Sequence, residues 1–117
     1  MNVPLEIDFK DMEKSQALEA VIRGKVDKLE EFHDRIMRCH VVVEAPHRHQ
    51  QQGKQFHVNV RLTVPGGELV SSRHAPNPAH EDANVAVRDA FDAIRRQLED
   101  HVRIQRGDVK AHSNPQA

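Results

Sequence analysis

The chain has 117 residues, 38% of them hydrophobic, which suits one ordinary domain that buries about two-thirds of the surface of its unfolded chain. No apolar run is long enough to cross a membrane, and the single cysteine excludes a disulfide framework. The 17 basic and 18 acidic side chains give a net charge of -1, whereas compact nucleic-acid-binding domains are usually basic.

The local composition is more informative than the total. Residues 45–64 carry three cations and no acid, so the chain has one locally positive segment. The four phenylalanines, with no Trp or Tyr, argue against binding of single strands by base stacking. The N-terminus already has acids at Glu6 and Asp8 and lacks the basic start and apolar stretch of a secretory signal. We therefore expect a cytoplasmic protein.

The first half of the chain predicts a strand, a helix and a second strand. Apolar residues alternate with polar ones over 3–10, which is the period of a strand with one buried face. Ser15 then precedes apolar residues spaced by four, four and three, which predicts a helix over 16–32 with Ser15 as its N-cap. The valine-rich stretch 36–44 predicts the second strand.

The second half predicts two more strands and a long helix. We expect a loop over 44–55 and then a strand over 56–64, where the alternation is unbroken. The Pro-Gly-Gly turn that follows predicts a hairpin with a fourth strand over 69–74, whose buried face the sequence does not define. A stripe of apolar residues from Val87 onward predicts a helix that ends near Gly107.

The element order β-α-β-β-β-α predicts an α+β fold, a four-stranded sheet with two helices packed on one face and the other face solvated. We expect one domain over residues 1–107 and a disordered tail over 108–117. The expected core consists of Leu18, Ile22, Leu29, Val58, Val60, Leu62, Phe91, Ile94 and Leu98. The solvated face is expected to carry Glu6, Asp8, His57, Asn59, Arg61 and Thr63.

No arrangement of residues in the sequence indicates catalysis. Cys39 and His40 are neighbours on a predicted strand, so their side chains point to opposite faces and cannot act together as nucleophile and base. We expect Cys39, which shares its face with Met37, Val41 and Val43, to be a buried structural thiol. Two or three imidazoles could gather around a metal from a group of four histidines: His47, His49, His57 and His74. Because the loop with His47 and His49 also holds Arg48 and no carboxylate, we expect no bound metal. In the absence of any catalytic arrangement, we also expect no cofactor and no enzyme activity.

The last predicted helix carries a group of arginines on its outer face: Arg88, Arg95, Arg96, Arg103 and Arg106. Asp92 and Glu99 lie in the same stripe, three or four residues from several of these arginines. From the spacing alone, a solvated helix with ion pairs is favoured over a stripe that binds phosphates.

Four stretches of the sequence carry motifs that occur together in one protein family. The first helix reads Lys-Val-Asp-Lys-Leu-Glu-Glu-Phe over 25–32, and the third strand with its turn reads Leu-Thr-Val-Pro-Gly-Gly-Glu-Leu over 62–69. His-Glu-Asp at 80–82 opens the last helix, and Arg-Gln-Leu follows at 96–98. In these motifs and in its element order, the chain resembles the ribosome hibernation promoting factors, also called ribosome-associated inhibitors, over about residues 3–106.

The resemblance implies a double-stranded-RNA-binding-like domain that docks on the small ribosomal subunit, between head and body. There it occupies space that messenger and transfer RNA need. Carried over residue by residue, the RNA-binding positions are Lys25 and Lys28 in the first helix and Arg96 in the second. To these we add cations that our own assignment of faces leaves exposed: Arg23, Arg61, Arg88 and Arg95.

Two interpretations of function stay open at this point. The first is a translation-regulating hibernation factor of the short form, monomeric off the ribosome, whose partners are the small ribosomal subunit and its rRNA. The alternative is a protein-interaction or metal-responsive module of the same fold that does not bind ribosomes. It is motivated by the histidine cluster and by Glu31, Glu99 and Asp100, which stand where family members usually carry basic residues.

Overall fold

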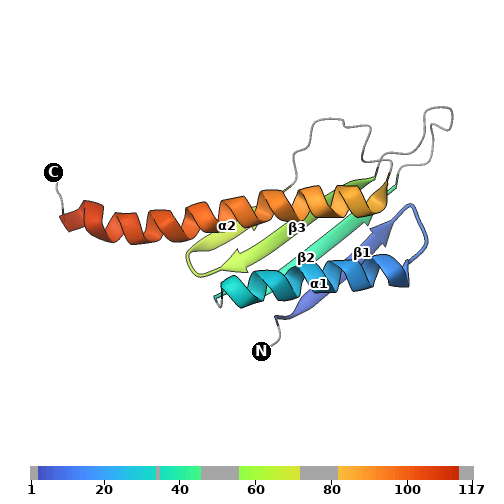
Figure 1. Ribbon diagram of the computed structural model, residues 1–117, viewed down its shortest axis with the longest axis horizontal. Coiled ribbons are helices and arrows are strands. Elements are labelled where there is room, and N and C mark those ends of the chain that lie inside the picture. Colours follow the sequence, from blue (N-terminus) through green and yellow to red (C-terminus); the bar gives the residue numbers. More distant parts are fainter. Residues whose placement is uncertain (1–2, 34, 46–55, 72–81, 114–117) are drawn as a thin grey trace.

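The computed structural model describes residues 3–33, 35–45, 56–71 and 82–113, with side chains described up to Ile104. The elements follow the predicted order β-α-β-β-β-α, so the predicted α+β fold is confirmed (Figure 1). They are β1 (Leu5–Lys10), α1 (Gln16–Phe32), β2 (Arg38–Glu44), β3 (His57–Val64), β4 (Gly67–Val70) and α2 (Ala83–Ser113).

The four strands form one sheet in the order β1-β2-β3-β4. β1 and β2 are parallel because α1 connects them as a crossover, and the other two pairs are antiparallel. Both helices lie side by side over the same face of the sheet and run in the same direction (Figure 1). The opposite face carries the exposed and half-buried side chains of the alternating strands, as the sequence predicted.

α1 begins and ends where the sequence predicts. The Ser15 hydroxyl accepts a hydrogen bond from the Leu18 amide at 3.1 Å, which confirms Ser15 as the N-cap. Leu18, Ile22 and Leu29 are buried against the sheet together with Val26. All nine residues of the predicted core are buried in one cluster, which the helices share with the inner faces of β2 and β3.

α2 is held over the β3–β4 hairpin by two polar contacts as well as by its apolar stripe. The Gln97 side-chain amide donates to the Val70 carbonyl oxygen at 3.0 Å, and His101 Nε2 lies 3.2 Å from the Pro65 carbonyl oxygen. These contacts fix the rotation of α2 about its axis. They therefore decide which of its arginines face α1.

The hairpin turn corrects the predicted start of β4. Gly66 has a φ of 94°, and Pro65 precedes it, which is the pattern of a type II turn with glycine at its third position. This two-residue turn lets Gly67 pair directly with Val64, so β4 begins at Gly67 rather than at residue 69. The predicted end of this strand, 72–74, lies outside the described residues.

Two further expectations were wrong. α2 does not end near Gly107 but continues to Ser113, so it includes residues 108–113 of the expected tail. The helix can continue through Gly107 because an interior glycine costs a helix only about 1 kcal/mol. Residues 114–117 lie outside the described residues. Met37, expected on the buried face with Cys39, is 55% exposed because it lies before β2 begins, where the alternation of the strand does not yet hold. Within the described ranges, neither helix is long and apolar enough to span a membrane.

Candidate functional site

The helical layer contains a groove between α1 and α2. Its lining residues come from the second half of α1 and the middle of α2: Lys25, Lys28, Leu29, Phe32, His33, Phe91, Asp92 and Arg95. The groove encloses about 280 Å³. We call it the α1–α2 groove. It brings three of the seven predicted site residues, Lys25, Lys28 and Arg95, to one place.

The helical period explains why these cations meet. Leu29 is buried, and Lys25 and Lys28 lie four and one residues before it, on the flank of α1 that faces α2. On α2, Phe91 is buried and Arg95 follows one turn later at the edge of the buried stripe. Two parallel helices on one sheet therefore place a cation-bearing flank of each helix opposite the other.

Arg88 belongs to the same flank of α2, because seven residues make two turns with an offset of only about 20° from Arg95. Its Nε atom lies 3.7 Å from Asp89 Oδ1, so part of its charge is offset locally. Arg95 is likewise 3.9 Å from Asp92, and both side chains are about half exposed. The predicted ion-paired helix is thus present at these two positions.

The cations carried over from the family motifs behave differently. Among the described residues, Lys25, Lys28 and Arg96 make no ion pair. Arg96 is exposed and lies about 100° around α2 from Arg95, on the outward side of the helix. These three positive charges are available to a negatively charged partner that approaches the helical layer.

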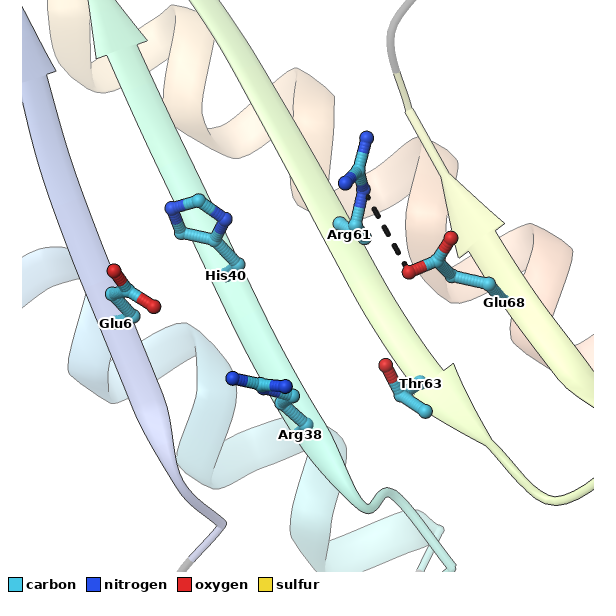
Figure 2. A pocket seen from close by; sticks show the side chains of 6 residues that line it. All are labelled: Glu6, Arg38, His40, Arg61, Thr63 and Glu68. Atoms are coloured by element: carbon cyan, nitrogen blue, oxygen red, sulfur yellow. Dashed lines mark ion pairs between the residues drawn. The ribbon is translucent and has the colours of Figure 1, made fainter.

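Two predicted residues do not join this group. Arg23 is exposed about 160° around α1 from Lys25, on the flank that faces away from α2. Arg61 lies on the other side of the molecule, on the solvated face of β3, where its Nε atom is 3.8 Å from Glu68 (Figure 2). The sequence predicted Arg61 on the solvated face, opposite the helices, but it did not predict that Arg23 lies on the flank of α1 that faces away from α2.

The solvated sheet face has a shallow hollow of its own. Figure 2 shows its lining side chains on all four strands: Glu6, Arg38, His40, Arg61, Thr63 and Glu68. Two arginines and two glutamates balance one another here. This surface is therefore less suited to a polyanion than the helical layer is.

Glu6, Asp8 and His40 form a cluster that the sequence did not predict. One potential ligand atom from each lies within 4.8 Å of the others. Parallel pairing aligns Glu6 with His40, and His40 Nε2 lies 2.8 Å from Asp8 Oδ2, so an exposed pair across two strands accounts for their closeness. Only the register of β1 against β2 could have revealed it. Of the predicted histidine cluster, His57 is exposed on β3, and His47, His49 and His74 lie outside the described residues.

Cys39 is a structural thiol, as predicted. It is fully buried on the core face of β2 and pairs in register with Leu62, while His40 points to the opposite face. Burial raises the pKa of the Cys39 thiol to about 12. A thiol of this kind is not a nucleophile near neutral pH.

The comparisons with known proteins agree with this architecture. Residues 5–106 match the family described as "Sigma 54 modulation protein / S30EA ribosomal protein". The chain is similar in structure to a ribosomal subunit interface protein from Coxiella burnetii, with a TM-score of 0.67 and 15% identity over 85% of this chain and 97% of that one. It is also similar to the N-terminal domain of Protein Y from Thermus thermophilus, with a TM-score of 0.60 and 16% identity over 86% and 99% of the two chains.

A comparison with curated protein sequences finds no match. At such low identity the two solved structures establish a shared fold, whereas the family match spans nearly the whole chain. It confirms the family resemblance that the sequence motifs indicated. The chain therefore belongs to the Sigma 54 modulation protein / S30EA ribosomal protein family.

Proposed function

We propose that the chain binds the small ribosomal subunit through its helical layer and regulates translation by occupying space that messenger and transfer RNA need. Family membership supports association with the ribosome. One observation supports the choice of the helical layer as the binding surface. Lys25 and Lys28, which have no ion-pair partner among the described residues, face Arg95 across the α1–α2 groove.

Ribosomal RNA favours such a surface because it presents closely spaced phosphates. Each cation that neutralises a phosphate releases condensed counterions, and this gain depends on where the cation lies rather than on the total charge of the protein. Structured RNA is recognised largely by its shape and backbone. A rigid pair of helices with fixed cations suits that mode of recognition.

The proposed action is steric and needs no covalent chemistry, so the protein acts as a binding factor and not as an enzyme. It works as a monomer off the ribosome, in the cytoplasm where ribosomes are. Lys25, Lys28 and Arg96 are the principal rRNA contacts, and Arg88 and Arg95 extend the same surface. Arg23 and Arg61 lie on other surfaces and contribute only if rRNA surrounds the domain.

Sedimentation of the purified protein with isolated small subunits, isolated large subunits and whole ribosomes tests the proposal. We expect salt-sensitive binding to small subunits that excess messenger RNA and transfer RNA displace. The double variant Lys25→Ala with Lys28→Ala should lose this binding. The matched variant Lys10→Ala with Lys14→Ala removes two exposed lysines elsewhere and should retain it. Equal binding by both double variants would exclude this surface.

The alternative is a module of the same fold that does not bind ribosomes and responds instead to a protein or a metal. The closeness of Glu6, Asp8 and His40 on the sheet face is the observation that favours it. The same sedimentation experiment separates the two functions. Absence of any complex at low salt, together with a shift in melting temperature on addition of zinc or manganese, would favour the alternative.

A further inference from the structure

Phe32 differs from the other phenylalanines of the chain in its surroundings. Phe91 belongs to the buried core, and Phe9 and Phe56 pack against it as partly buried residues. Phe32, the last residue of α1, is 72% exposed and takes no part in that cluster. Because hydrophobic stabilisation grows with the apolar area that is buried, this ring contributes little to the stability of the fold.

The surroundings of the exposed ring are cationic. Lys25, Lys28 and Phe32 are spaced by three and four residues, so they follow one another along the same flank of α1. All three line the α1–α2 groove, with Arg95 on the opposite rim and Leu29 and Phe91 contributing apolar surface. An aromatic ring at one end of a groove flanked by cations matches the chemistry of a nucleotide, which joins a flat base to a phosphate.

We propose that the groove binds an unpaired RNA nucleotide, with its base stacked on Phe32 and its neighbouring phosphates on Lys25, Lys28 and Arg95. This inference rests on the proposed function and adds that the site stacks on one base that is not in a duplex. At about 280 Å³ the groove is at the lower end of ligand pockets, which suits a single base. Stacking on an aromatic side chain is tolerant of base identity because every base has a π-face.

An acidic peptide would fit this groove less well. None of the described residues that line the groove belongs to a strand, so an extended peptide would find no sheet edge there to pair with its own amides and carbonyls. Its apolar lining is limited to Leu29, Phe32 and Phe91, which is too little for an amphipathic helix with several anchors. Charge also favours a polyanion, since Asp92 is the only acid among the described residues that line the groove.

The proposal departs from what the composition alone indicated. Four phenylalanines and no Trp or Tyr argue against a platform that stacks many bases in succession. One exposed ring among cations is sufficient for one base. We therefore propose stacking for a single nucleotide only, and the rest of the rRNA is still recognised by its shape and backbone.

The absence of Trp and Tyr from the sequence makes a direct test possible. In Phe32→Trp, the introduced indole is the only one in the chain and reports on stacking through its fluorescence. A short single-stranded oligoadenylate should quench it, whereas inorganic polyphosphate of matching charge should bind without quenching. Ile104→Trp places the reporter at another exposed apolar position, 58% exposed, and should respond to neither probe. Equal quenching of the position-32 reporter by both probes would overturn the proposal.

A second measurement does not depend on the reporter. Anisotropy of a labelled oligoadenylate should show that Phe32→Ala weakens binding roughly fivefold or more, while polyphosphate binding is unchanged. Parent-like RNA affinity of Phe32→Ala would also overturn the stacking. If Lys25→Ala with Lys28→Ala then still loses ribosome binding, only the base contact is wrong and the proposed function stands. If Phe32→Ala and the double variant Lys25→Ala with Lys28→Ala both bind ribosomes like the parent, the proposed function fails as well.

Discussion

Simultaneous replacement of Lys25, Lys28 and Arg96 by alanine tests the electrostatic account most directly. None of the three has an ion-pair partner among the described residues, so their removal leaves no acid unpaired there. Lys28 and Arg96 are exposed and Lys25 is only partly buried, so the free energy of unfolding should change by about 0.5 kcal/mol or less per site. Any loss of binding is then a loss of contacts and not of structure.

The expected size of the effect follows from the number of phosphate contacts removed. Each contact contributes about 0.7 to 0.9 to the slope of log affinity against log salt concentration. Three lost contacts should therefore reduce that slope by roughly two to three. Between about 50 and about 200 mM salt, the parent should lose roughly 20- to 40-fold more affinity than the variant does.

Sedimentation with small subunits over this range of salt gives both slopes, and circular dichroism melts check the fold. Lys10→Ala with Lys14→Ala serves as the control, because it also removes lysines but leaves the helical flank intact. Its slope should equal that of the parent. The reasoning is refuted if the triple variant keeps the parent's slope, or if the control loses as much slope per charge.

The other predictions concern stability and charge. Phe91→Ala should lower the free energy of unfolding by about 3–5 kcal/mol in denaturant melts, because Phe91 is 4% exposed. Phe32→Ala should lower it by less than about 1 kcal/mol. Similar losses for the two variants would contradict the assignment of Phe91 as buried and Phe32 as exposed. Native Cys39 should react with a thiol reagent near pH 8 far more slowly than the denatured chain. Fast labelling of the native chain would contradict the burial of this thiol. Because the folded-state pKa of Cys39 lies near 12, above its ordinary value of 9.0, the free energy of unfolding should fall as the pH rises from about 9. A chelator should leave the melting temperature unchanged, since the core contains no metal ligand set among the described residues, and a large drop would revive a metal-dependent fold. Glu99→Lys, on the flank of Arg88 and Arg95, should tighten small-subunit binding more than Asp100→Lys, and the reverse order would contradict that placement.

Most of the fold could be predicted because periodicity reports burial directly. The unbroken alternation over 57–64 and the four-four-three spacing in α1 each leave only one face for the core. The boundaries of β4 and α2 were harder, because they depend on local terms of about 1 kcal/mol. A positive φ at Gly66 starts β4 early, and Gly107, which resembles a helix stop, is carried inside a helix with a long apolar stripe.

The candidate site could be predicted only in part, for a geometric reason. Helical spacing places Lys25 and Lys28 on one flank of α1, but it does not say which flank faces α2. That choice depends on how the helices are placed across the sheet, where α2 lies over β3 and β4 with α1 beside it. Arg61 is the opposite case, because strand alternation and element order already placed it on the solvated face, away from the helical cations.

A near-neutral chain can still present a cationic surface, because some of its acids are paired with arginines and others lie on the far side of the sheet. On α2, Asp89, Asp92 and Asp100 each contact an arginine, so these pairs contribute little net field. The acids of the sheet face lie behind the sheet in a molecule whose shortest extent is 17 Å, about twice the Debye length of about 8 Å at physiological salt. Of the lysines and arginines that line the α1–α2 groove, Lys25 and Lys28 are the ones that no described acid pairs with, so they are the cations most available to a phosphate there. For this reason the charge of -1 does not weigh against RNA binding, and affinity should depend on individual lysines more than on the isoelectric point.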